Sequence, residues 1–405
     1  MSKIPKYFMY FPGNYRWSAA FVNMLGRASY GGADISELHK IGRLLEGKSS
    51  DDDEAWFDAC VKVADEVRAH AERFRAAGHR VSAAGFYLRA CHYYQMGERF
   101  RTPKDDKALA AYRIAVDCFH QFTALTDVRI EIVEVPFEGT HLPGYFVHAQ
   151  NAKSQRTPCV VFFDGLDVTK EIQFVRGVPD LVKRGISCLV MDGPGTGEAI
   201  RFRGMPLRHD YERAGSACVD FLEGRADVDP ARIGIVAISL GGYYAPRCAA
   251  LDRRFAACIA WGAIWDYYGT WKKRIDAGFK ASMSVPGHHI MWILGVDSLE
   301  AALRKLEQKL AEAGAKAELL VTQHRRTRAV GKAADAQAAV GDRSKLATFD
   351  RMRAKVERSE AVGQAKAALA GEDIDDRFAK LEKEEEIERM LAEIKQRRGS
   401  AVQKH

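Results

Sequence analysis

The chain has 405 residues, of which 47% are hydrophobic and 28% are charged, so it is not a wholly disordered protein, and its length predicts two or three domains. The net charge of +7 is mild for this length, and no Lys/Arg run alternates with aromatic residues, so no nucleic-acid partner is predicted. The sequence contains no apolar run of transmembrane length and no continuous signal-peptide core. The eight cysteines form no C-x-x-C pair, which disfavours a zinc or redox motif and favours a cytoplasmic location.

The first 125 residues have the spacing of amphipathic helices. Apolar side chains recur every three or four positions between Val61 and Phe74, and two further helices are predicted near 82–96 and 107–125. We therefore expect a helical N-terminal region over residues 1–125.

From residue 126 the pattern changes to short strands. Val128–Phe137 alternates apolar and polar residues and predicts a strand that pairs with Leu142–His148. Helical patterns then separate short apolar runs, which predict strands at Cys159–Phe163, Ile186–Met191, Ile233–Ile238 and Ala256–Trp261. This order predicts an α/β fold with a doubly wound, mostly parallel sheet over residues 126–298, a range that includes a lid segment and lacks the last strands of the fold.

The last part of the chain, residues 299–405, has a different composition. Phe349 and Phe378 are its only aromatic residues, and it is rich in alanine and charged residues. Between Leu299 and Leu320, leucine and alanine recur with steps of four and three, which is the spacing of a heptad seam. We expect a long-helix, all-α coiled-coil tail that forms a homo-oligomer.

A serine follows the predicted strand Ile233–Ile238 and precedes a predicted helix. The sequence Ala237-Ile-Ser239-Leu-Gly241 matches the G-x-S-x-G pattern of a nucleophile elbow, with alanine in place of the first glycine. Small neighbours are required because the backbone of such a turn is crowded. Ser239 is therefore predicted to be a catalytic nucleophile, and an ordinary strand–turn–helix is the alternative.

The loop after the strand Cys159–Phe163 is the predicted partner of this serine. In such a fold one backbone N–H of an oxyanion hole comes from this loop, here Gly165 or Leu166, and the other comes from the residue after the serine, Leu240. The alternative is a simple glycine turn in which Asp167 caps a helix.

A second glycine-rich loop, Asp192–Glu198, also follows a strand. It lacks the G-K-[ST] ending of a phosphate-binding loop and the spacing of a dinucleotide fingerprint, so no nucleotide cofactor is predicted. The acidic run Asp51–Glu54 precedes a predicted helix, where helix-dipole complementarity explains it without a metal.

Several of these segments together resemble a branch of the α/β-hydrolases. That branch includes 2,6-dihydroxypseudooxynicotine hydrolase, fungal polyketide-shortening hydrolases and the fermentation-respiration-switch esterase-like proteins. The resemblance covers residues 1 to about 306 and is carried by Ser82–Tyr94, Asp164–Asp167, Asp192–Glu198, Ile238–Ala245 and Ala257–Gly262. It implies hydrolysis of a small-molecule ester, or of a C–C bond next to a ketone, without a cofactor.

The acid and histidine that should follow the serine are not evident in the sequence. No late strand followed by an aspartate loop or a histidine loop is apparent, and the chain enters the heptad instead. Asp266 could replace the acid, although helix capping or a salt bridge is the favoured reading. His288 and His289 could replace the base, although packing or substrate contact is favoured.

The tail carries a resemblance of its own. Residues from about 306 to 398 are similar to the C-terminal part of phage shock protein A, on the segments Asp342–Met352, Ser359–Leu369 and Asp375–Lys395. That family's N-terminal amphipathic helix has no counterpart, so membrane association is not favoured. Two functions follow from the sequence: a serine hydrolase, which is inactive if the triad is incomplete, or a non-enzymatic oligomerising protein.

Overall fold

In the computed structural model the chain divides into two compact units, Met1–Ala313 and Gly314–His405. The structure describes residues 8–49, 51–102, 104–152, 154–166, 168–276, 287–298, 300, 301 and 304. The second unit, most of the predicted heptad and the segment that resembles phage shock protein A lie outside these residues. The predicted coiled coil and homo-oligomer therefore stay predictions.

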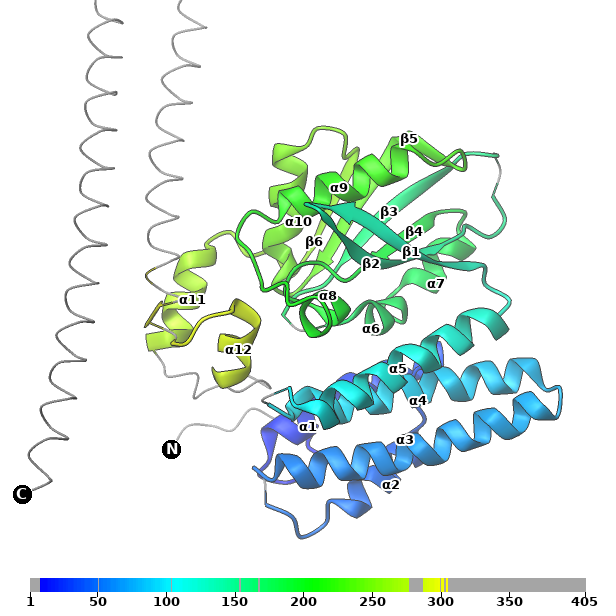
Figure 1. The fold of residues 1–405 in the computed structure, drawn as a ribbon, viewed down its shortest axis with the longest axis vertical. Helices are drawn as coiled ribbons and strands as arrows, with labels where there is room; N and C mark the ends of the chain where they lie inside the picture. The colour runs from blue at the N-terminus through cyan, green and yellow to red at the C-terminus, as the bar shows by residue number, and fades with distance from the viewer. Residues whose placement is uncertain are drawn as a thin grey trace, which may run out of the picture. The chain divides into compact units, whose positions relative to one another are not determined.

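Helices make up the described part of the chain before residue 126 (Figure 1). The three predicted helices are present. Those near 61–74 and 82–96 are longer than predicted at both ends, and the one near 107–125 begins one residue earlier. The elements are α1 (Tyr15–Leu25), the 3-10 turn η1 (Ala28–Tyr30), α2 (Ile35–Leu44), α3 (Asp53–Ala76), α4 (Arg80–Phe100) and α5 (Asp106–Leu125). Asp52 caps α3, because its carboxylate accepts the Ala55 N–H at 2.8 Å, and Asp53 and Glu54 fill the first turn.

The sheet that follows has six described strands in the order β1-β2-β4-β3-β5-β6. β1 and β2 form an antiparallel hairpin, β2 is antiparallel to β4, and the remaining neighbours are parallel. The expected mostly parallel α/β sheet is thus confirmed. The strands are β1 (Ile130–Phe137), β2 (Thr140–Val147), β3 (Thr157–Phe163), β4 (Ser187–Met191), β5 (Val228–Ile238) and β6 (Ala257–Trp261).

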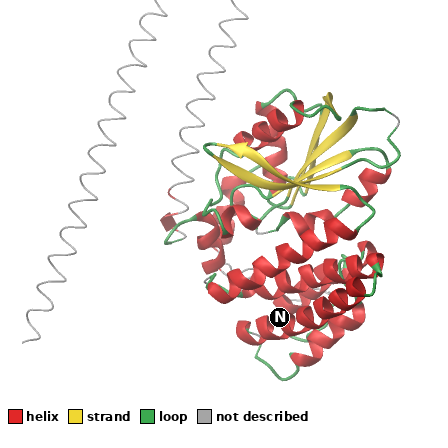
Figure 2. Ribbon diagram, turned by 45° about the vertical axis from the view of Figure 1, so that its right-hand side comes forward, coloured by secondary structure: helices red, strands yellow, loops and turns green. Residues whose placement is uncertain are grey.

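Helices cover both faces of this sheet (Figure 2). One buried apolar cluster joins the N-terminal helices and two short helices to side chains such as Tyr145 and Val190, and a second joins α9 and α10 to the opposite face. The helices of this part are α6 (Lys170–Phe174), α7 (Val178–Lys183), α8 (Gly197–Arg201), α9 (Glu212–Glu223), α10 (Gly241–Leu251), α11 (Tyr267–Asp276) and α12 (Gly287–Leu294).

β6 forms one edge of the described sheet. Its residues are largely exposed, with 59% of Ile259 and 59% of Trp261 accessible to solvent. Among the described helices, none is both long and apolar enough to cross a membrane.

Glycines on α4 allow a direct test of its packing. A β-carbon on Gly85 would meet nothing closer than Arg89 Nη1 at 3.8 Å, whereas one on Gly97 would lie 2.9 Å from Cys60 Cβ. We expect Gly85→Ala to raise the free energy of unfolding by about 0.5–1 kcal/mol, because alanine loses less backbone entropy in a helix. Urea unfolding is the measurement. Gly97→Ala is the matched control and should lower the free energy of unfolding. A higher free energy of unfolding for both variants would contradict this account of the packing.

Candidate active site

Ser239 lies on a sharp turn between β5 and α10. Its φ is +60°, a left-handed conformation that few residues other than glycine adopt, and its N–H donates to the Trp261 carbonyl oxygen at 2.9 Å. This is the backbone geometry of a nucleophile elbow. The serine is exposed, and it lines a cavity.

The glycines after the serine permit the turn. A β-carbon on Gly242 would lie 2.1 Å from the Gly262 carbonyl oxygen, and one on Gly241 would lie 2.7 Å from Ala237 Cβ. Because these contacts are with backbone or with a short rigid side chain, neither position has room for a larger residue. Because Gly241 has no β-carbon, the methyl group of Ala237 fits where the consensus has glycine.

A proline inside α10 ties the elbow to β6. Pro246 has no N–H, so the carbonyl of Gly242, four residues earlier, cannot receive its usual helical hydrogen bond. That carbonyl accepts instead from the N–H of Ile264, just after β6, at 3.3 Å. The proline thus frees an acceptor that fastens the start of the helix to the neighbouring strand.

The predicted oxyanion loop lies directly against the elbow. A β-carbon on Gly165 would be 2.6 Å from Leu240 N and 2.9 Å from Ser239 Cβ, so only glycine allows this approach. The Gly165 N–H donates to Asp164 Oδ1 at 2.6 Å and is already engaged. The predicted donors that remain are the N–H groups of Leu166 and Leu240; Asp167 lies outside the described residues.

A cavity of about 650 Å³ opens in front of Ser239. Its described lining residues come from α1 and the turn after it, from the C-terminal half of α4, from positions between Asp164 and Gly177, from the end of α8 and from the carboxyl ends of β5 and β6. The N-terminal helices therefore contribute directly to the space in which a substrate of this serine would sit. A concave site of this size suits a small organic molecule.

The structure does not bring the three predicted partners to this cavity. Asp266 is exposed, and its Oδ1 accepts the Gly269 N–H at 2.7 Å, so it caps α11 as the favoured reading had it. His289 is buried with its Nδ1 3.1 Å from Thr102 Oγ1, and His288 is exposed. None of the three is among the cavity's described lining residues, and no described histidine or carboxylate hydrogen-bonds Ser239 Oγ.

The loop Asp192–Glu198 has a structural role that the sequence did not reveal. Asp192 accepts hydrogen bonds from the backbone N–H of Lys170 at 2.8 Å and of Glu198 at 2.9 Å. Gly197 is required here because a β-carbon would lie 2.0 Å from the Asp192 carboxylate. The loop folds back on the aspartate that begins it.

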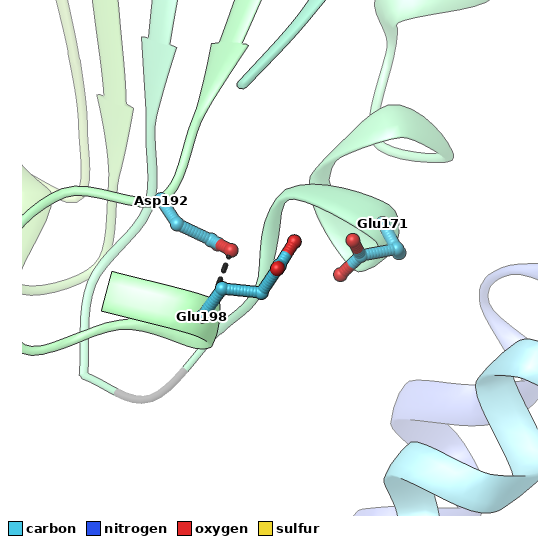
Figure 3. A group of neighbouring side chains, drawn as sticks. All are labelled: Glu171, Asp192 and Glu198. Carbon is cyan, nitrogen blue, oxygen red and sulfur yellow. Dashed lines mark hydrogen bonds between the residues drawn. The ribbon is translucent and has the colours of Figure 1, made fainter. Parts of the chain in front are cut away.

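Three carboxylates converge beside this loop: Glu171, Asp192 and Glu198 (Figure 3). Their spacing would suit a metal ion, but the Lys170 ammonium lies 2.8, 2.9 and 2.6 Å from them in that order. The lysine, which is 1% exposed in its side chain, therefore supplies the cation that these acids require. We name these four residues the Lys170 cluster.

The charges of the Lys170 cluster perturb one another. Burial opposes the charged form of Glu171, but the Lys170 ammonium and the hydrogen bonds from Lys170 and Tyr145 outweigh it and lower the pKa of Glu171 to about 2. Burial dominates at Asp192, and with repulsion from Glu171 it raises the pKa to about 6 despite Lys170. The three acids together raise the pKa of the Lys170 ammonium.

The fold and the elbow together define an α/β-hydrolase. The family model of the FrsA-like esterases ("Esterase FrsA-like") matches residues 56–277, and the chain belongs to this family. The resemblance to the hydrolase branch is thereby confirmed. The match does not extend to the segment similar to phage shock protein A, and that similarity stays a prediction.

Several proteins named as hydrolases are similar to the chain. The α/β hydrolase ucsC of Acremonium sp is 32% identical over 298 residues, which cover 67% of this chain and 60% of ucsC. The 20-hydroxy-prefusarin hydrolase FUS2 of Gibberella moniliformis is 29% identical over 71% of this chain and 76% of its own length. The crystal structure of 2,6-dihydroxy-pseudo-oxynicotine hydrolase is 27% identical, with a TM-score of 0.57 over 69% of this chain and 73% of that one.

Proposed function

We propose that the protein is a serine hydrolase that cleaves an ester, or a C–C bond next to a ketone, in a small organic substrate, without a cofactor. The observation that carries this proposal is the position of Ser239, which stands on a left-handed turn at the mouth of a 650 Å³ cavity. The names of two similar proteins specify hydrolysis of 20-hydroxy-prefusarin and of 2,6-dihydroxy-pseudo-oxynicotine, which supports a small substrate by analogy.

In the proposed reaction Ser239 Oγ attacks the carbonyl carbon of the bound substrate. The negative charge that develops on the carbonyl oxygen is received by the N–H groups of Leu240 and Leu166, which come from two adjoining turns. The departing alkoxide or carbanion takes up the proton that Ser239 Oγ gave up, and water then hydrolyses the acyl–serine ester, which releases a carboxylic acid and restores the serine hydroxyl. Efficient attack requires a base for the Oγ proton, and His288 and His289 are the candidates that the sequence offers.

The alternative is a non-catalytic oligomer built on the coiled-coil tail. It concerns residues outside the described part of the chain, and no contact among the described residues favours it. The hydrolase proposal does not depend on it.

Labelling of the full chain with a fluorophosphonate probe, read by intact mass, tests the proposal. We expect one adduct, mapped to Ser239, and its loss in Ser239→Ala, because an elbow serine with an oxyanion site is the group that such probes modify. Ser216→Ala is the matched control, since the Ser216 hydroxyl donates to Asp252 Oδ2 at 2.8 Å and Ser216 is not among the cavity's described lining residues. A folded protein that takes no adduct, or an adduct that persists in Ser239→Ala, would contradict the proposal.

A further inference from the structure

The cavity in front of Ser239 contains a buried cation. Arg27 follows α1, lines the cavity and is 7% exposed. Its Nη1 lies 3.0 Å from Met24 Sδ, its Nε has no hydrogen-bond partner, and no described carboxylate lies within ion-pair distance of it. A guanidinium has five N–H donors, and burying it without an anion is costly.

Other arginines line the same cavity. Arg176 is paired with Asp164 at 2.6 Å, and Arg201 is paired with Glu98 at 2.8 Å. The two carboxylates of the described lining, Asp164 and Glu98, are used in these pairs, and no described carboxylate pairs with Arg27. Burial, reinforced by repulsion from Arg176 and Arg99, lowers the pKa of Arg27 to about 9.

The positive charge of Arg27 lies close to the elbow. Asp164 begins the loop whose Gly165 contacts Ser239, and the charges of Asp164, Arg176 and Arg99 are all close enough to act on Arg27. A substrate that extends from Ser239 across the cavity therefore reaches the arginines. The turn after helix α1, which carries Arg27, and helix α4, which carries Arg99, both line this cavity.

We propose that Arg27, with Arg99, binds an ionised oxygen group of the substrate, a carboxylate or an acidic enol, while Ser239 acts on a carbonyl elsewhere in the same molecule. The inference rests on the proposed function for the part of the substrate that is cleaved, but the binding of the anion does not require cleavage. An anion bound here satisfies the open donors of Arg27 and removes the cost of its unpaired charge through charge-assisted hydrogen bonds. The substrate class is thus an acidic keto compound or ester.

The experiment uses the full chain with Ser239→Ala, so that nothing is cleaved. Binding of 4-oxo-4-phenylbutanoate is compared with that of its uncharged primary amide by titration calorimetry. We expect the acid to bind about tenfold or more tightly than the amide, the size of one to two hydrogen bonds to a charged group. Adding Arg27→Met should reduce the affinity for the acid to that for the amide and leave the amide unchanged.

Controls separate the charge from the fold. Arg27→Met removes a buried charge that has no partner, so its thermal unfolding temperature should be equal or higher, while Arg27→Lys should keep part of the preference. Arg99→Met, in helix α4, should also weaken binding of the acid severalfold. Arg232→Met removes the same charge from an exposed pair with Asp229 and should leave the preference unchanged.

Equal binding of the acid and the amide, no detectable binding of the acid, or a preference that survives Arg27→Met would overturn the inference. Fluorophosphonate labelling of Ser239 is independent of these measurements, because it reports the nucleophile and not the anion site. A labelled serine with no acid preference overturns only the anion site. An acid preference without labelling overturns only the proposed hydrolase.

Discussion

Replacing Lys170 with methionine is expected to lower the free energy of unfolding at pH 7.5 by about 3–5 kcal/mol, because it leaves two buried carboxylates and one partly buried carboxylate without their cation. Lys170 Nζ contacts Glu171, Asp192 and Glu198 within 2.9 Å, and its side chain is 1% exposed. Methionine has a similar length, so the change removes the charge and little volume. Urea unfolding followed by circular dichroism measures the loss.

The pH dependence distinguishes this charge effect from a packing effect. In the wild type Glu171, with its pKa lowered to about 2, contributes stability that is present above its unfolded pKa near 4.5 and is lost as the pH falls toward 2. Asp192, with its pKa raised to about 6, acts in the opposite sense: the folded state takes up a proton first, so stability is gained as the pH falls from about 6 toward 4.

Without Lys170 the folded state should hold protons on more of these carboxylates than the unfolded chain does. The variant should therefore gain stability as the pH falls from 7.5 to 5. The difference in free energy of unfolding between variant and wild type, here called the gap, should become smaller. Lys40→Met is the matched control, since its pair with Glu66 is half exposed and should change stability by less than about 1 kcal/mol. A gap that is the same at pH 7.5 and pH 5 would show that packing, and not charge, causes the loss.

Gly242→Ala is expected to disable the serine. The added β-carbon would lie 2.1 Å from the Gly262 carbonyl oxygen, which is backbone and cannot turn aside. The start of α10 must then move away from β6, and with it Ser239 and the Leu240 N–H. We expect fluorophosphonate labelling of Ser239 to slow about 100-fold, because small displacements of a catalytic group have effects of this size, and stability to fall by about 1–3 kcal/mol.

The control for this prediction is Gly234→Ala, on the strand that leads into the elbow. Its β-carbon would meet Ala257 Cβ at 3.5 Å, an ordinary contact, so labelling should proceed at the wild-type rate. Labelling of Gly242→Ala at an undiminished rate would mean that the elbow tolerates a wider separation from β6 than the structure indicates.

The features predicted best from the sequence were local ones. Apolar runs bounded by small residues encode the strands from Cys159 onward, the turn at Ser239 and the helix after it. Such patterns can be recognised without knowledge of the fold. The order of strands and helices then restricted the topology, since parallel neighbours need crossover helices. The structure agrees with these predictions to within a few residues at most strand ends, although β5 begins earlier, at Val228.

The features that sequence reasoning missed depend on residues far apart in the chain. Lys170 was not singled out, because nothing near it in sequence reveals that Asp192 and Glu198 fold over it. Arg27 was missed for the same reason: it lines a cavity whose other lining residues, such as Arg99 and Arg176, lie far from it in the sequence. The available signal for the Lys170 cluster was the pair Lys170-Glu171, in which two ionisable residues adjoin each other among apolar neighbours such as Val168 and Ile172.

Site predictions that relied on chain order alone were the weakest. Asp266 follows β6 as an acid might, yet its carboxylate serves the first turn of α11. His289 lies in an aromatic segment, but it packs against Trp292 and Thr102. Gly165 lies beside the serine, but its N–H donates to Asp164 Oδ1, and this use of the N–H could not be inferred from the sequence.

The contacts between the elbow and β6 mean that the serine's geometry is not a property of its own loop. The Ser239 N–H bonds Trp261, the Gly242 carbonyl released by Pro246 bonds Ile264, and Gly242 abuts Gly262. β6 is one of the two edge strands of the described sheet, and edge strands with exposed faces open more readily than central ones. The turn at Ser239 therefore depends on an exposed edge strand, and we expect any opening of β6 to release the restraints that hold the left-handed conformation of the serine.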